Sequence, residues 1–142
     1  CGVCDDGAAV NGLCHDGTPA QFLFTQSMFQ AYYYSNTVTI DGNNVETDDW
    51  VGAFKGDVCV GARQWNTSDV PVMGWCDYIN DSDCDYPPAP FDEYLLPGDI
   101  PTFKIYDASA NAYYDAVASE DIPPWYNFGL NNIESLNAIT NP

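Results

Sequence analysis

The segment from Asp48 to Ala62, DDWVGAFKGDVCVGA, constrains the fold more than any other part of the chain. Its residues alternate with a period of two on both sides of Lys55-Gly56-Asp57, where a Gly-Asp pair provides a turn. This pattern predicts a β-hairpin. Gly52 and Gly61 lie inside the two predicted strands, where glycine weakens a strand, so we expect another backbone or a ring to approach closely there.

The chain has 142 residues, which suits a single domain with a sizeable core. Its 21 acidic and 3 basic residues give a formal charge of −18. That charge would repel nucleic acid and anionic membrane surfaces, so we expect neither as a partner. A solvated acidic tail is excluded because 46% of the residues are hydrophobic. No apolar run approaches the length of a membrane-spanning helix, so no membrane insertion is expected.

Six cysteines and a single histidine indicate disulfides rather than a zinc site. Disulfides indicate an oxidising, extracellular compartment, and a chain that begins at Cys1 suggests that a signal peptide has been removed. We expect two local bonds, Cys4–Cys14 and Cys76–Cys84. Cys59 is then left over with Cys1, and a bond between them would tie the N-terminus to the hairpin of its own chain or of a neighbour.

The order of the predicted elements divides the chain into two parts. Residues 1–26 hold three cysteines and predict a disulfide-stapled N-terminal arm, and residues 27–142 predict a β-domain. Aromatic and β-branched residues separated by turn residues favour strands, and no amphipathic helix is apparent. We expect strands at 22–26, 28–40, 50–55, 58–62, 70–75 (an edge strand because of Pro71), 100–108, 112–118 and 133–139. Such spacing predicts an all-β fold, an antiparallel β-sandwich of jelly-roll or Greek-key type.

Two stretches together resemble a β-sandwich module of large secreted and surface proteins. They are WVGAFKGDVCVG in the hairpin and FKIYD at 103–107, with an entry strand that runs from Phe29-Gln30 to Ile40-Asp41-Gly42. The resemblance spans roughly residues 27–118. It implies a repeated extracellular module of the kind found in adhesins, surface layers and fibres, with no catalytic residue in its motif. The N-terminal arm and the Cys76–Pro97 loop depart from that pattern.

An enzyme is not expected from the remaining residues. The single histidine, His15, lies in a Cys-His-Asp-Gly turn, and no Gly-x-Ser-x-Gly elbow is present. Acidic residues are abundant, but nothing in the sequence marks two of them as facing each other across a cleft.

An acidic cluster in the long loop is the candidate metal site. Asp77, Asp81, Asp83 and Asp85 lie close together, and the alternation of the last three is typical of a calcium loop. Tyr86 stands where such a loop has its glycine. Two interpretations therefore stay open, a calcium site and a solvated acidic loop.

Two sequons predict N-glycosylation, one beginning at Asn66 and one at Asn80. Both lie in predicted surface turns of a chain that we expect to be secreted. A glycan on Asn80 and a metal bound by Asn80 exclude each other, so the second sequon competes with the calcium interpretation.

Two functions follow from these features. In the first, Phe22, Leu23 and Phe24 lie along the exposed sheet edge of a neighbouring copy, and the chain is an extracellular structural protein, the subunit of a self-assembling surface fibre. In the alternative, exposed rings of Trp125 and Tyr126 stack on sugars in a carbohydrate-binding or adhesin module. The expected partner is therefore another copy of this chain, or a glycan.

Overall fold

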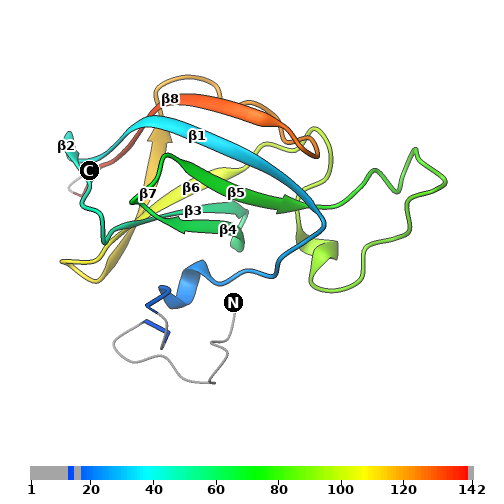
Figure 1. Ribbon diagram of the computed structural model, residues 1–142, viewed down its shortest axis with the longest axis horizontal. Coiled ribbons are helices and arrows are strands. Elements are labelled where there is room, and N and C mark those ends of the chain that lie inside the picture. Colours follow the sequence, from blue (N-terminus) through cyan, green and yellow to red (C-terminus); the bar gives the residue numbers. More distant parts are fainter. Residues whose placement is uncertain (1–12, 15–16, 141–142) are drawn as a thin grey trace.

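The computed structural model describes residues 13–14 and 17–140 of the chain. These residues form strands and two short 3-10 helices, without an α-helix, so the all-β class is confirmed (Figure 1). The helices are η1 (Ala20–Phe22) and η2 (Phe91–Glu93). The strands are β1 (Phe29–Ile40), β2 (Asn43–Asn44), β3 (Trp50–Lys55), β4 (Val58–Gln64), β5 (Asp69–Gly74), β6 (Thr102–Asp107), β7 (Ala112–Ala118) and β8 (Leu130–Ala138).

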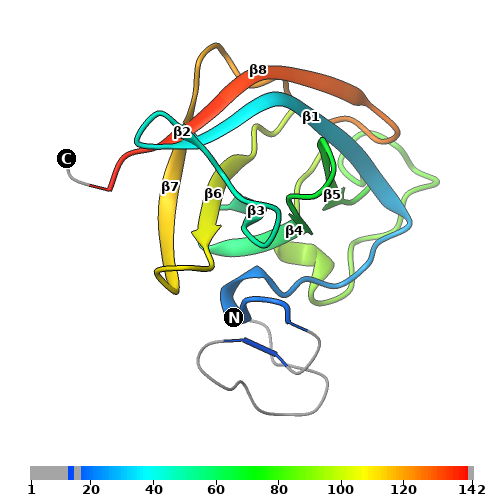
Figure 2. The ribbon, with the colours of Figure 1, turned by 60° about the vertical axis from the view of Figure 1, so that its left-hand side comes forward.

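The strands form one mixed sheet that curls around the core (Figures 1 and 2). The sheet has the order β2-β1-β8-β7-β6-β3-β4, and β5 pairs with the first half of β1. The pair β1–β8 is parallel, whereas the other pairs are antiparallel. The expectation of a purely antiparallel sheet is therefore wrong. The alternation of side chains is the same in both directions, so the sequence pattern carries no signal for strand direction.

The curl closes where β4 and β5 lie against each other. A Cβ atom built on Gly61 of β4 would lie only 1.8 Å from the carbonyl oxygen of Pro71 on β5. On its other side β5 pairs with β1, where Pro71 lies opposite Tyr32. Because β5 pairs with no other described strand, Pro71 lies on an edge strand, as predicted. The expected close approach at Gly61 is confirmed, and it is an approach of backbone to backbone.

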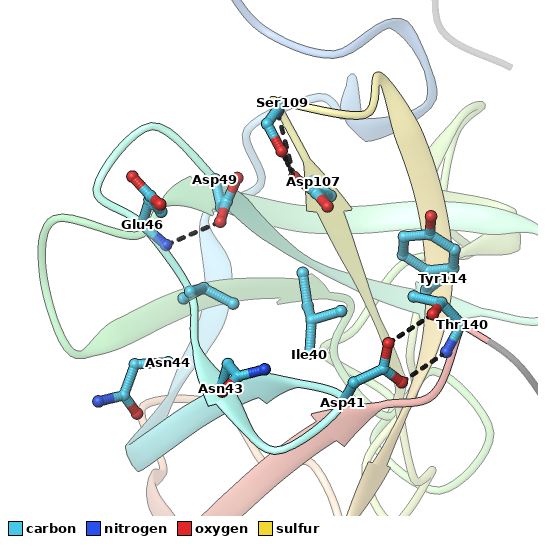
Figure 3. A pocket seen from close by; sticks show the side chains of 11 residues that line it. Ile40, Asp41, Asn43, Asn44, Glu46, Asp49, Asp107, Ser109, Tyr114 and Thr140 are labelled. Atoms are coloured by element: carbon cyan, nitrogen blue, oxygen red, sulfur yellow. Dashed lines mark hydrogen bonds between the residues drawn. The ribbon is translucent and has the colours of Figure 1, made fainter.

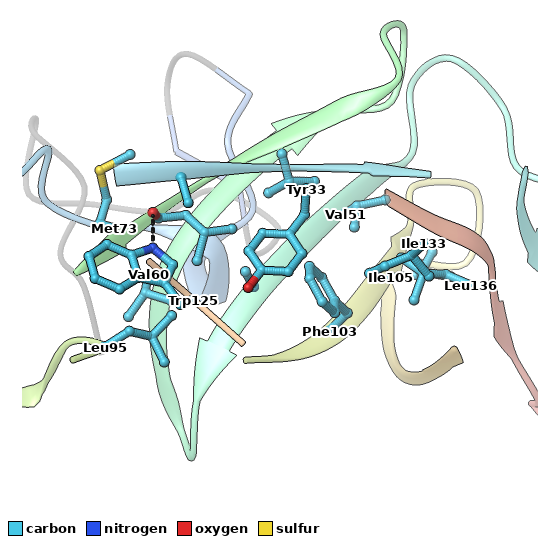
Figure 4. Packing of buried hydrophobic residues seen from close by; sticks show 14 of the residues in the cluster. Tyr33, Val51, Val60, Met73, Leu95, Phe103, Ile105, Trp125, Ile133 and Leu136 are labelled. Atoms are coloured by element: carbon cyan, nitrogen blue, oxygen red, sulfur yellow. Dashed lines mark hydrogen bonds between the residues drawn. The ribbon is translucent and has the colours of Figure 1, made fainter. Parts of the chain in front are cut away.

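The main core fills the inside of the curled sheet (Figure 4). Tyr33 and Trp125 are its largest buried side chains, and the polar end of each is satisfied. The Tyr33 hydroxyl donates to the carbonyl of Pro123 at 2.7 Å, and Trp125 Nε1 donates to the carbonyl of Val72 at 2.9 Å. Burial raises the pKa of Tyr33 well above its usual value. The remaining labelled members are Val51, Val60, Met73, Leu95, Phe103, Ile105, Ile133 and Leu136.

A second, smaller core lies on the opposite, outer face of β3, β4 and β6. Its buried members are Phe22, Phe54, Cys59, Ala62 and Tyr106. Phe22 comes from the N-terminal part of the chain, where the strand predicted at 22–26 is replaced by η1 and an unpaired extended segment. The other predicted strands are present, and the last one begins earlier than expected, at Leu130.

Candidate functional site

The predicted interface residues 22–24 lie against their own domain rather than along a free sheet edge. Phe22 is 0% exposed, and its ring meets those of Phe54 and Tyr113 edge-on at centroid distances of 5.7 and 5.3 Å. A Cβ atom on Gly52 would lie 2.8 Å from Phe22 Cε1, so the glycine makes room for this ring. In this structure Phe22 is therefore enclosed by its own domain, and a contact of Phe22 with a neighbouring copy stays a prediction. We call Gly52, Phe54, Tyr106 and Tyr113 the Phe22 seat.

Side chains and two backbone hydrogen bonds hold the N-terminal segment, which we define as residues 17–26, to the domain. Its backbone makes two hydrogen bonds to phenol oxygens: Gln21 N donates to Tyr113 Oη at 3.2 Å, and Thr25 N donates to Tyr94 Oη at 2.8 Å. Apart from an isolated bridge between Leu13 and Pro19, the segment pairs with no strand of the described chain. Three side chains add to this attachment: Phe22, Phe24, which packs against both cores, and Gln26, whose Nε2 donates to Met73 Sδ at 3.5 Å.

Cys59 lies in the same outer core and carries a free thiol. Its side chain is 7% exposed, and its sulfur donates a hydrogen bond to the carbonyl of Gly61 at 3.4 Å. Burial raises the pKa of Cys59 to about 12. The expected bond between Cys1 and Cys59 is thus not formed in this structure, because the thiol is enclosed among aromatic rings.

The other disulfide expectations fare differently. The Cys76–Cys84 bond is present, with a Cα–Cα distance of 6.0 Å. Cys14 is also disulfide-bonded. Its expected partner, Cys4, lies outside the described residues. The pairing Cys4–Cys14 therefore stays a prediction.

The acidic loop extends away from the curled sheet (Figure 1), and two of its carboxylates accept hydrogen bonds from nearby residues of the loop. Asp77 accepts hydrogen bonds from the backbone and side-chain nitrogens of Asn80, both at 3.1 Å, and these bonds lower the pKa of Asp77. Asp81 accepts one from the backbone nitrogen of Asp83 at 2.9 Å. In residues 13–14 and 17–140 no three Asp, Glu, His or Cys side chains gather into a metal-binding group. The predicted calcium ligands, including Asp85, are therefore not brought together.

Both sequon asparagines are exposed, as a glycan requires. Asn66 follows the end of β4, and Asn80 lies in the acidic loop between β5 and η2. Glycosylation at these positions stays a prediction.

A pocket of about 360 Å³ opens at one end of the sheet, between the loop that follows β1 and the turn between β6 and β7 (Figure 3). Asp49 lies at its inner wall and is only 3% exposed. Its carboxylate accepts hydrogen bonds from the backbone nitrogens of Glu46 at 2.7 Å and Ala108 at 2.8 Å. Asp49 therefore joins two loops. The pocket is lined by Ile40, Asp41, Asn43, Asn44, Val45, Glu46, Asp49, Asp107, Ser109, Tyr114 and Thr140.

Two other carboxylates of this pocket, those of Asp107 and Asp41, also bind neighbouring residues of the chain. Asp107 accepts hydrogen bonds from the backbone nitrogen and the hydroxyl of Ser109, at 3.1 and 2.7 Å. Asp41 accepts hydrogen bonds from the hydroxyl and backbone nitrogen of Thr140, and these lower the pKa of Asp41. A carboxyl group with a lowered pKa is ionised at neutral pH and is a poor general acid. The hydrogen bonds of Asp41, Asp49 and Asp107 therefore hold the loops around the pocket in place.

An exposed apolar turn, which we call the 126–130 turn, leads into β8 and includes its first residue, Leu130. Phe128 and Leu130 are 73% and 71% exposed, and Tyr126 is 55% exposed, as expected for that residue. Trp125 is 0% exposed and lies in the main core, so the expectation that it binds sugar is wrong. A Cβ atom on Gly74 would lie 2.5 Å from the Trp125 ring, so this glycine provides the space that buries it.

The 126–130 turn is fixed in place despite its exposure. Phe128 N donates to the carbonyl of Gln30 on β1 at 2.7 Å, and Gly129 N donates to that of Tyr126 at 2.9 Å. Phe128 has a φ of +63°, which is uncommon for a bulky side chain. Neither Phe128 nor Leu130 was predicted from the sequence as a contact residue. The signal available was Asn127-Phe128-Gly129, a turn sequence with an apolar residue at its centre.

Two tyrosines of β1 point outward beside this turn. Tyr33 is buried, so by alternation Tyr32 and Tyr34 lie on the outer face. Tyr32 is paired with Leu130 on one side and with Pro71 on the other. Among the described residues, neither Tyr32 nor Tyr34 makes a ring–ring contact, and neither hydroxyl makes a hydrogen bond.

Comparisons with protein-family models, curated proteins and solved structures find no match for this chain. The resemblance to adhesin and fibre modules stays a prediction. None of the helices formed by residues 13–14 and 17–140 is long and apolar enough to cross a membrane.

Proposed function

We propose that this protein is an extracellular structural protein, the subunit of a self-assembling surface fibre. The observation that carries the proposal is the 126–130 turn, where Phe128 and Leu130 expose more than two thirds of their surface in a strongly acidic chain. Exposed apolar groups that cluster at one place on a protein are typical of contact surfaces between proteins. The Cys76–Cys84 disulfide supports the extracellular location.

The backbone of the turn supports the same function. A residue with a side chain in the left-handed region costs about 1–3 kcal/mol, and such residues persist where the surrounding structure fixes them. Here the neighbouring Trp125 is buried and Phe128 is hydrogen-bonded to β1. Trp125 and the hydrogen bond to β1 thus fix the backbone that carries the exposed ring of Phe128. Aromatic side chains are among those that contribute most to the binding energy of protein interfaces.

Assembly of such an acidic protein must also overcome electrostatic repulsion. Each copy carries a formal charge of −18, so copies repel one another at low ionic strength. Salt at about 0.15 M screens this repulsion beyond roughly 8 Å. Association through the neutral 126–130 turn should therefore strengthen as the salt concentration rises, unlike association through ion pairs.

The test is electron microscopy and analytical ultracentrifugation of the purified protein over a range of concentration and salt. We expect filaments or large oligomers, and we expect Phe128→Ser to weaken assembly by at least about tenfold. Val117→Ser is the matched control, because Val117 is 67% exposed and lies on β7. A protein that stays monomeric in every condition would contradict the proposal, as would equal weakening by both substitutions.

A carbohydrate-binding module is the second candidate, now supported by Tyr32 and Tyr34 in place of Trp125. Both side chains are half-buried on the outer face of β1, and their hydroxyls are not bonded to described residues, so the exposed part of each ring could contact a sugar and each hydroxyl could hydrogen-bond to it. Polysaccharide pull-down tests this function with the double substitution Tyr32→Ala/Tyr34→Ala. Tyr86→Ala is the control, since Tyr86 is 68% exposed on the acidic loop. Binding that survives the double substitution excludes this surface.

A further inference from the structure

We propose that the N-terminal segment is exchanged between copies, so that Phe22 of one copy occupies the Phe22 seat of the next. This inference rests on the proposed function, because it names a contact through which copies join. The partner is a second copy of this chain, and the surface is the outer face of β3, β6 and β7. Three features of the structure carry the inference.

The first feature is that the seat exists independently of the segment that fills it. Gly52, Phe54, Tyr106 and Tyr113 belong to β3, β6 and β7, which pair with one another and with β4 and β8. No strand pairing in this part of the sheet involves residues 17–26. Removing the segment would uncover an apolar depression above Gly52 but leave the sheet complete.

The second feature is that the segment can leave without breaking secondary structure. Its described backbone bonds to the main domain reach only the hydroxyls of Tyr94 and Tyr113. Residues 23–27 form no helix or strand before β1 begins. The same Phe22 contacts and the same two hydrogen bonds would form with a neighbour's seat, so exchange replaces each contact by an identical one. If each copy inserts its segment into the next copy, the copies join head to tail and form an open chain rather than a closed ring.

The third feature is electrostatic. Residues 17–26 contain no charged side chain, although the whole chain carries −18. One of the three basic residues of the chain lies on this face: Lys104 Nζ is 5.0 Å from the centre of the Phe54 ring. A neutral segment approaching this face of another copy therefore meets less repulsion than it would elsewhere.

Complementation of two full-length variants tests the exchange. Phe22→Ala removes the ring but leaves its own seat open, whereas Gly52→Leu keeps Phe22 but blocks its own seat. In an equimolar mixture, Phe22 of the Gly52→Leu chain can enter the open seat of the Phe22→Ala chain. We expect native mass spectrometry and sedimentation to find a 1:1 heterodimer as the main species.

The control is Gly52→Leu alone at twice the concentration, which supplies free Phe22 rings but no open seat. It should give at least tenfold less dimer than the mixture. Cys59 provides a second readout, because it lies in the cluster that Phe22 completes. Its thiol should react faster with a thiol reagent in Phe22→Ala alone, and mixing should restore protection. Circular dichroism establishes that each variant is folded, and Phe22→Leu replaces Phe22→Ala if the latter is not.

Folded variants that show neither a heterodimer nor restored protection of Cys59 would overturn the exchange. The outcome is separable from that of the fibre proposal. If the wild-type protein forms filaments that Phe128→Ser abolishes, yet the mixture contains only monomers, the exchange is wrong and the fibre proposal stands. If the mixture forms heterodimers and the wild-type protein never forms filaments, the fibre proposal is wrong and the exchange stands.

Discussion

Replacing Gly61 with alanine tests how the sheet closes. The new Cβ atom would lie 1.8 Å from the carbonyl oxygen of Pro71 and 2.9 Å from its carbonyl carbon. Both are backbone atoms of β5, so neither can rotate away, and the β4 and β5 strands would have to separate. Added atoms in a packed core cost about 1–3 kcal/mol when side chains can shift. Because here the backbone must move, we expect a loss of about 4 kcal/mol or more.

Gly52→Ala is the matched comparison. Its Cβ atom would lie 2.8 to 3.0 Å from three atoms of the Phe22 ring, and a side chain on an unpaired segment can shift. We expect a loss of about 1–2 kcal/mol for this variant. Urea denaturation at neutral pH measures both, and a shared m-value would show that the unfolding transition is the same. In thermal unfolding, Gly61→Ala should lower Tm by about 10 °C or more.

Gly61→Ala must lower the free energy of unfolding more than Gly52→Ala does. If Gly61→Ala is no more destabilising than Gly52→Ala, the approach of β4 to β5 is looser in solution than in the structure. The sheet would then not close between β4 and β5 in solution.

Three further results are expected. Asp49→Ala should cost about 2–4 kcal/mol in urea denaturation, since it leaves two backbone N–H groups without an acceptor, whereas the exposed neighbour Asp48→Ala should cost almost nothing. Cys76→Ser should cost about 2–3 kcal/mol in the same assay, because it frees a loop closed over a sequence separation of 8, and no effect would mean that the loop unfolds separately from the sheet. Finally, the pKa of Cys59 is raised from 9.0 to about 12, so the unfolded thiol ionises first and stability should fall as pH rises above 9. Cys59→Ala should flatten that decline, and an unchanged pH profile would contradict a buried, protonated thiol.

Much of the fold could be predicted because its strongest signals are local. The central hairpin follows from a period of two on each side of a Gly-Asp turn, and Pro71 marks an edge strand because it cannot donate to a ladder. Gly52 and Gly61 indicated close approach, and both have it. The parallel pairing of β1 with β8 could not be predicted, since it joins strands separated by almost the whole domain.

The candidate sites were harder to predict because exposure depends on distant residues. Phe22 and Trp125 lie in aromatic stretches of the sequence, and such stretches have the same composition whether their rings are buried or exposed. Phe22 is buried because Gly52 leaves space above β3, and Trp125 is buried because Gly74 leaves space beside β5. The sequence indicated that a ring would approach Gly52, but it did not indicate which ring. Phe128 was missed for the opposite reason, since an apolar residue in a turn is ordinarily expected to point inward.

Charge connects the two proposed contacts. Each of the three basic residues pairs with one carboxylate, Lys55 with Asp99, Arg63 with Asp69 and Lys104 with Asp115, so a net charge of −18 remains. Copies can approach closely only where this charge is absent. The two longest uncharged stretches that include described residues are 17–40 and 122–133.

These two stretches meet where β1 and β8 pair, from Tyr32–Leu130 to Ser35–Ile133. The first contains the N-terminal segment, and the second contains the 126–130 turn. A neutral surface on a strongly acidic protein loses little on contact with a second neutral surface, while the surrounding charge prevents contact elsewhere. The charge that keeps copies apart elsewhere is therefore absent from the two segments through which we propose that copies associate. A single charge placed within it, as in Phe128→Asp, should oppose assembly more than the loss of the ring alone in Phe128→Ser.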